Sequence, residues 1–175
     1  MSEAAVAGLL VLLVLLALIA VRAADLLLAV VALGGYSFAM ALVWAAIGAV
    51  DVAFTEAVVG AGVTMVFMLA ALLRTSRRRS PVAVGIQQVA LPVVLVVGFL
   101  LVALTTALPP WADPAAPAAV HVSPRYLERA VAETATPNVV TAVLADYRGY
   151  DTLIETVVIL TAGLGCWLLL GRRTP

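Results

Sequence analysis

The chain has 175 residues, 65% of them hydrophobic, and its ten acidic residues balance ten basic ones. Soluble domains are roughly half apolar, so a mean hydropathy of +1.16 predicts an all-α integral membrane protein. A net charge of zero excludes the basic surface that nucleic-acid binding requires. A single cysteine, Cys166, excludes an internal disulfide and a CxxC metal site.

Charged residues divide the sequence into uncharged runs of 18, 25, 17, 33 and 16 residues. A helix needs about 20 apolar residues to cross the hydrocarbon core. We therefore predict five transmembrane helices, at residues 4–22, 26–49, 54–73, 86–108 and 152–170. The first run follows Glu3 and no basic residue, which favours a retained helix over a signal peptide. The third and fifth runs are short, so we expect Glu56 and Glu155 to be drawn into the membrane boundary.

Arginine residues are distributed unequally between the two ends of these helices. If five helices alternate in direction, one side of the membrane receives seven arginines: Arg22, Arg74, Arg77, Arg78, Arg79, Arg172 and Arg173. The other side receives three: Arg125, Arg129 and Arg148. Because positive residues favour the cytoplasmic side, the pattern predicts an outside N-terminus and a cytoplasmic C-terminus in the cell inner (plasma) membrane.

The long connection at residues 109–150 contains two helical patterns. Ser123 and Pro124 are typical of a helix start, with the serine as cap and the proline in first position. Apolar residues then recur at helical spacing in the segment 139–144, which suits contact with the membrane surface or a partner. His121 lies in this connection; a lone histidine there is usually only solvated, and proton collection is the minor alternative.

Two carboxylates precede the apolar part of the third helix. Asp51 is explained as the negative residue that caps a helix N-terminus. Glu56 lies a turn further in, where a carboxylate costs a few kcal/mol, so a functional role and a structural pairing both remain open. Gly60 and Gly62 follow it and permit either close helix packing or a bulged turn.

A second group of charges precedes the fifth helix. Arg148, Asp151 and Glu155 share one face if the helix already extends over them, and Arg148 would then pair with Asp151. Glu155 has only threonines as polar neighbours, which would push its carboxyl group toward the neutral form and suit proton exchange. A charge cluster that stabilises the helix dipole is sufficient for Asp146.

Two blocks of sequence resemble modules of known membrane complexes. DVAFTEAVVGAGVTMVFMLAALL, at residues 51–73, resembles the D-subunit module of membrane-bound hydrogenases (MbhD). The same module occurs near the C-terminal end of the large A-subunit of Mrp-type sodium/proton antiporters. NVVTAVLADYRGYDTLIETVVIL, at residues 138–160, resembles the E-subunit module (MbhE) that follows it, with several polar residues at matching spacing. The resemblance implies an MbhD-like module with four helices at residues 1–108, an extracytoplasmic loop at 109–137 and an MbhE-like module at 138–175.

The resemblance also implies a five-helix protein similar to the J-subunit of respiratory complex I, whose third helix carries a bulge beside a proton path. The bulge corresponds here to Val59, Gly60, Ala61 and Gly62. The tyrosine that usually precedes Ala-Gly is replaced by glycine, so a hydroxyl-dependent gate cannot be carried over. The ion-linked carboxylates of the family correspond to Glu56, Asp151 and Glu155, with Arg148 as the partner of Asp151.

We therefore expect a small subunit of a multisubunit monovalent cation/proton antiporter, with H⁺ and Na⁺ as the transported ions. It would work with other subunits in the lipid bilayer, without a cofactor, a metal site or enzymatic activity of its own. The chain has no lysine, whereas the antiporter-like helices of these complexes carry one, so we do not expect a complete pump. Two alternatives are a subunit of a related hydrogenase or respiratory complex, in which other subunits perform the redox chemistry, and a purely structural scaffold.

Overall fold

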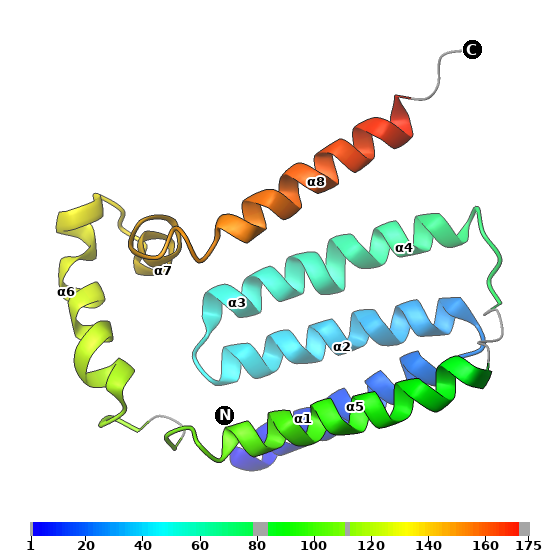
Figure 1. Ribbon diagram of the computed structural model, residues 1–175, viewed down its shortest axis with the longest axis horizontal. Coiled ribbons are helices and arrows are strands. Elements are labelled where there is room, and N and C mark those ends of the chain that lie inside the picture. Colours follow the sequence, from blue (N-terminus) through cyan, green and yellow to red (C-terminus); the bar gives the residue numbers. More distant parts are fainter. Residues whose placement is uncertain (1, 79–83, 111–112, 172–175) are drawn as a thin grey trace. The chain divides into compact units, whose positions relative to one another are not determined.

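The computed structural model describes residues 2–78, 84–110 and 113–171. Within them the regular structure is helical, and five helices are long and apolar enough to cross a membrane (Figure 1). The predicted all-α class and the five apolar helices are thereby confirmed for the described part of the chain. Three of the arginines used to predict orientation lie outside it, namely Arg79, Arg172 and Arg173. The chain divides into two units, residues 1–94 and 95–175, which we describe separately.

The first unit is built around the second helix. It contains α1 (Glu3–Arg22), α2 (Leu26–Ala46) and a third rod made of α3 (Val50–Thr55), η1 (Glu56–Thr64) and α4 (Met65–Leu72). Figure 1 shows α2 between α1 and this third rod, and α2 contacts all of these elements. In its most apolar stretch 39% of the residues are buried, against 6% for α1 and for the third rod. The core of this unit is therefore α2.

Small residues let the other helices approach α2 on two sides. Toward α1, Ala39 and Val43 form a buried cluster with Leu13. Toward the third rod, Gly34 lies so close to Met65 that a methyl group on the glycine would be 2.7 Å from the sulfur. Helices in lipid associate mainly through such close van der Waals packing, because lipid tails are as apolar as the side chains.

The connection between α2 and α3 makes both helices differ from the predicted ranges. Gly48 adopts a φ of +86°, a left-handed conformation that is easily accessible to glycine. The turn therefore ends α2 at Ala46 instead of residue 49, and α3 begins at Val50 instead of residue 54. The predicted capping role of Asp51 is wrong, because Ala49 is the N-cap residue and Asp51 lies in the first turn. Its charge still lies at the positive end of the helix dipole.

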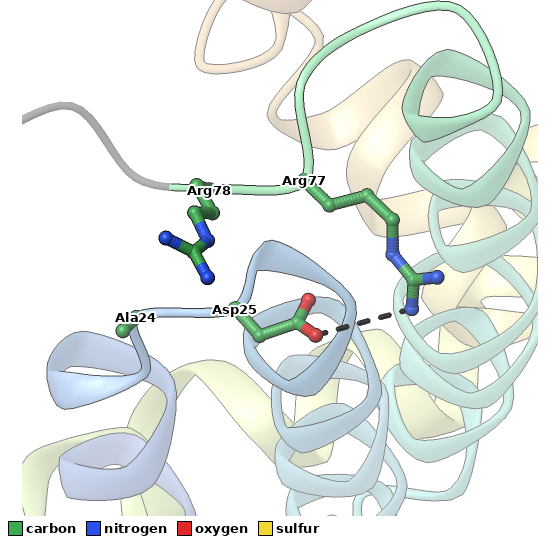
Figure 2. Close-up of a pocket in the computed structure, with 4 residues that line it drawn as sticks. All are labelled: Ala24, Asp25, Arg77 and Arg78. Carbon is green, nitrogen blue, oxygen red and sulfur yellow. Dashed lines mark ion pairs between the residues drawn. The ribbon is translucent and has the colours of Figure 1, made fainter.

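Asp25 joins the start of α2 to the segment that follows α4 (Figure 2). Its carboxylate accepts a hydrogen bond from the backbone N–H of Leu27 at 2.8 Å and lies 3.9 Å from the Arg77 guanidinium. The backbone N–H of Leu26 also donates to the carbonyl oxygen of Arg77 at 2.7 Å. A cavity of about 530 Å³ opens beside this corner. The third rod is thus fixed to α2 beyond its C-terminal end.

The helix α5 (Val84–Thr105) crosses the division between the two units. It ends before the predicted residue 108, in a series of turns in which Thr106, Ala107 and Leu108 each donate to a carbonyl three residues earlier.

The second unit also contains η2 (Ala118–Val122), α6 (Ser123–Thr134), α7 (Val139–Ala142), η3 (Val143–Tyr147) and α8 (Leu153–Leu170). The predicted cap at Ser123 is wrong, because η2 runs directly into α6 and makes Val122 the N-cap residue. A left-handed Ala135, with φ of 54°, ends α6. The helices α6 and α7 then contact each other, and Ala130 of α6 and Ala142 of α7 are almost completely buried.

Asp25 should contribute to stability mainly as a helix cap. We expect Asp25→Ala to lower the free energy of unfolding by about 1 kcal/mol, the usual loss when a capping carboxylate is removed. Arg77→Ala keeps the cap and removes only an exposed ion pair, so its loss should be smaller, below about 1 kcal/mol. Thermal unfolding of the purified protein in detergent measures both variants. Equal losses would contradict the assignment of the larger role to the cap.

Candidate functional site

The third rod of the first unit changes from an α-helix to a π-helix at Glu56. The π-helix η1 extends over nine residues, from Glu56 to Thr64, before α-helical structure resumes. Most π-helical segments are single turns inside α-helices and are frequent at functional sites. The residues for which a bulge was predicted, 59–62, all lie inside η1. Their part in transport stays a prediction.

Glu56 lies at the contact between η1 and α2. A methyl group on Gly60 would lie 2.5 Å from Oε1 of Glu56 and 2.7 Å from the hydroxyl oxygen of Ser37 on α2. Ser37 is buried, with 9% of its surface exposed, and Glu56 is half-buried. The fold thus brings a carboxyl group and a hydroxyl group from two helices to the same place. Ser37 was not predicted as a site residue, although it is the only serine or threonine of α2.

The second group of charges lies in the turns before α8. The predicted pair is present: the Arg148 side chain donates a hydrogen bond from Nε to the Asp151 carboxylate. The helix does not extend over this pair, because residues 148–152 form turns and α8 begins at Leu153. The predicted common helix face for 148, 151 and 155 is therefore wrong. The Thr152 hydroxyl closes these turns by donating to the carbonyl oxygens of Leu144 and Gly149 at 3.1 and 2.9 Å.

Glu155 lies in the first turn of α8 with its side chain exposed. Within the described residues no ion pair is found for it. His121 lies in η2 and is also exposed. In the same described part of the chain, no group of three or more His, Cys, Asp or Glu side chains could hold a metal ion. The chain therefore places its candidate carboxylates in two separate units, Glu56 in the first and Asp151 with Glu155 in the second.

A polar cluster that the sequence did not reveal connects α6 to η3. The Tyr147 hydroxyl donates to the Glu133 carboxylate at 2.5 Å, and Arg125 lies 3.8 Å from the same carboxylate. The rings of Tyr126 and Tyr147 are 4.8 Å apart. The hydrogen bond to Glu133 is the main reason that the pKa of Tyr147 is raised above its ordinary value. These contacts join residues far apart in sequence, so no local pattern indicates them.

Two family models match consecutive parts of the chain. The MbhD family, which describes the D-subunit of MBH, matches residues 4–77, and the MbhE family, which describes the E-subunit of MBH, matches residues 91–175. The first part of the chain belongs to the MbhD family and the second part to the MbhE family. The two matches omit only residues 1–3 and 78–90 of this MbhD/MbhE chain. The module boundary expected at residue 108 stays a prediction.

Known proteins similar to this MbhD/MbhE chain are antiporter components. It is 28% identical over 159 residues to a probable K⁺/H⁺ antiporter A/B-subunit of Rhizobium meliloti (strain 1021), covering 85% of this chain and 15% of that protein. It is 30% identical over 140 residues to a putative antiporter subunit of Staphylococcus aureus (strain MRSA252), covering 80% and 17%. A chain in the structure of the Mrp complex from Dietzia sp. DQ12-45-1b shares 35% identity and a TM-score of 0.75 over 94% of this chain. The MbhD/MbhE chain spans only 15% to 18% of the length of these proteins.

The Tyr147–Glu133 contact predicts a measurable titration. The folded chain raises the pKa of Tyr147 above the ordinary value of 10.0. The contribution of the Tyr147–Glu133 contact to stability should therefore be complete below pH 10 and disappear as the pH rises through the raised pKa. Tyrosinate absorbance, taken as the difference between the unmodified chain and Tyr147→Phe, measures this pKa. Glu133→Ala should return it toward the ordinary value. A titration that Glu133→Ala leaves unchanged would show that another group causes the shift.

Proposed function

We propose that this chain is a small membrane subunit of a multisubunit Mrp-type monovalent cation/proton antiporter. The observation that carries the proposal is the likeness to a chain of the Dietzia Mrp complex over 94% of the present chain. The relatives from Rhizobium and Staphylococcus support it, because each is named as an antiporter component. In this role the chain is a transport protein without enzymatic activity or a cofactor of its own, and the transported ions are H⁺ and Na⁺.

Within such a complex we assign this chain coupling helices and part of an ion path. Ionisable residues in transmembrane helices are costly to insert and commonly mark ion pathways. Glu56 begins a π-helix in the middle of a membrane-length rod, and Glu155 lies in the first turn of another membrane-length helix. Arg148 pairs with Asp151 in the turns that precede that second helix. His121, exposed in η2, remains a minor candidate for collecting protons.

Other subunits and lipid are the proposed partners, in a cell inner membrane. Among the described residues, the apolar stretches Gln88–Thr105 and Leu153–Leu170 contain no residue that is buried within the chain itself. Membrane-length helices whose apolar surfaces are left exposed need other surfaces to cover them, and the bilayer and neighbouring subunits both offer such surfaces. The chain alone should therefore not restore antiport.

Membership of a related hydrogenase or respiratory complex is the second candidate. The observation that favours it is that both matching family models carry the name MBH. Purification of the native complex with identification of its partners separates the two. Antiporter subunits alone would support the first proposal, and iron–sulfur or nickel proteins among the partners would support the second.

The proposed topology places the N-terminus outside and the segment between α4 and α5 in the cytoplasm, on the arginine distribution. Single cysteines at Ser76 and at Ala116, in the connection before η2, should therefore react with a membrane-impermeant reagent from opposite sides. Ala116→Cys should label in intact cells and Ser76→Cys only in inverted vesicles, with Cys166→Ser as the background for both. Labelling of both positions from one side would contradict the alternation of the helices.

Glu155 should be the most sensitive carboxylate of the second unit. We expect Glu155→Gln to leave the complex assembled but to lower cation/proton exchange by about a hundredfold, the lower end of what a positioned proton-transferring group contributes. Asp151→Asn should be milder, because Asp151 is paired with Arg148. The assay compares vesicles that contain equal amounts of assembled complex.

Asp146→Asn is the matched control for this series. Asp146 is exposed in η3, where a role as a surface charge is sufficient. The cation/proton exchange rate of the Asp146→Asn complex should therefore stay close to that of the unmodified complex. Normal exchange by the Glu155→Gln complex would show that the Glu155 carboxylate has a structural role, and would support the scaffold alternative for this unit. Loss of assembly in Glu155→Gln would do the same.

A further inference from the structure

We infer that Ser37 is a positioning residue for Glu56: its hydroxyl group on α2 and the side-chain-free Gly60 on η1 hold the Glu56 carboxyl group at the contact between the two helices. The functional consequence rests on the proposed ion-path role of Glu56. The contact itself does not, since it follows from the packing of α2 against η1.

The geometry places both polar groups against one glycine. A methyl group on Gly60 would lie 2.5 Å from Oε1 of Glu56, 2.7 Å from Oγ of Ser37 and 2.9 Å from Cβ of Ser37. All three distances are well below the optimum of about 3.5 Å or more for non-bonded carbon contacts. A side chain at residue 60 would therefore displace the Glu56 carboxyl group, the Ser37 side chain or both.

The Ser37 hydroxyl is available for this interaction. Serine and threonine side chains in helices commonly donate back to a carbonyl three or four residues earlier. Thr55 and Thr161 do so here, at 3.0–3.1 Å and 2.8 Å. Within the described residues no such bond is found for Ser37, although only 9% of its surface is exposed. The described residues contain no fully enclosed side-chain oxygen without a partner, so the Ser37 oxygen keeps some access to solvent. The carboxyl group beside it is a strong acceptor, to which one water molecule can connect the hydroxyl.

Other charged groups do not compete for Glu56 from the packed elements. On the third rod the nearest acid is Asp51, in the first turn of α3, and α4 has no titratable residue. On α2, Tyr36 packs against the cluster shared with α1, and Asp25 caps the far end of the helix. Ser37 is thus the hydroxyl group of α2 that lies with Glu56 against Gly60.

The test uses the purified complete complex and infrared difference spectroscopy. The carboxyl band of Glu56 is identified by its loss in Glu56→Gln. We expect Ser37→Ala to shift this band to higher wavenumber, because a carboxyl C=O that loses a hydrogen bond stiffens. Exchange should fall about tenfold, the upper end of the effect of losing one hydrogen bond between neutral groups. Ser37→Thr, which keeps the hydroxyl, should restore both the band position and the exchange rate.

Thr55→Val is the matched control. It also removes a hydroxyl group, from the residue before Glu56, but that hydroxyl donates to backbone carbonyl oxygens and not to the carboxyl group. It should leave the band in place. Gly60→Ala is the second variant, used also where Ser37→Ala does not assemble, and its added methyl group should shift the band with the serine intact. The inference is overturned if the Ser37→Ala complex assembles and its band is unshifted. If Ser37→Ala does not assemble, an unshifted band in Gly60→Ala overturns it. If Ser37→Ala shifts the band but Glu56→Gln exchanges ions normally, the contact stands and only the ion-path role is refuted.

Discussion

The close approach that small residues permit on both sides of α2 is the constraint on which the first unit depends. Lipid tails are as apolar as the helix surfaces, so burial of apolar area gives little net drive, and van der Waals contact decides the packing. Ala39 and Val43 admit the side chain of Leu13 from α1. Gly34 and Ser37 admit Met65 and η1 from the third rod. The same close packing that stabilises the unit therefore brings a hydroxyl group against the carboxyl group of Glu56.

The π-helix lies in a rod whose two ends are fixed. At one end Gly48 sets the turn from α2 into α3, and at the other Asp25 holds the segment after α4 through Arg77. A change from α-helix to π-helix alters the rotation and rise of the residues that follow it. With both ends attached to α2, such a change has to be accommodated at the contact with α2, where Gly60 leaves space. This is a physical reason for a glycine next to Glu56.

The features that the sequence predicted are those set by local physics. Charges are costly in lipid, so their spacing indicated five apolar helices, and all five are found. The Arg148–Asp151 pair was predictable because its residues are three apart. Helix caps were not: the expected roles of Asp51 and Ser123 failed because the flanking turns and η2 moved the helix starts. Ser37 beside Glu56, and Tyr147 beside Glu133, were missed because each contact joins two different elements.

The two candidate carboxylates on the membrane-length helices differ in where their partners come from. Glu56 is half-buried and has the hydroxyl of Ser37 beside it within its own unit. Glu155 is exposed at the start of α8, a helix whose apolar stretch is nowhere buried in the described part of the chain. A carboxylate at a membrane boundary needs water, a cation or a polar partner to stay ionised. For Glu56 the first unit provides part of that environment, whereas the described residues of the second unit provide no ion pair for Glu155.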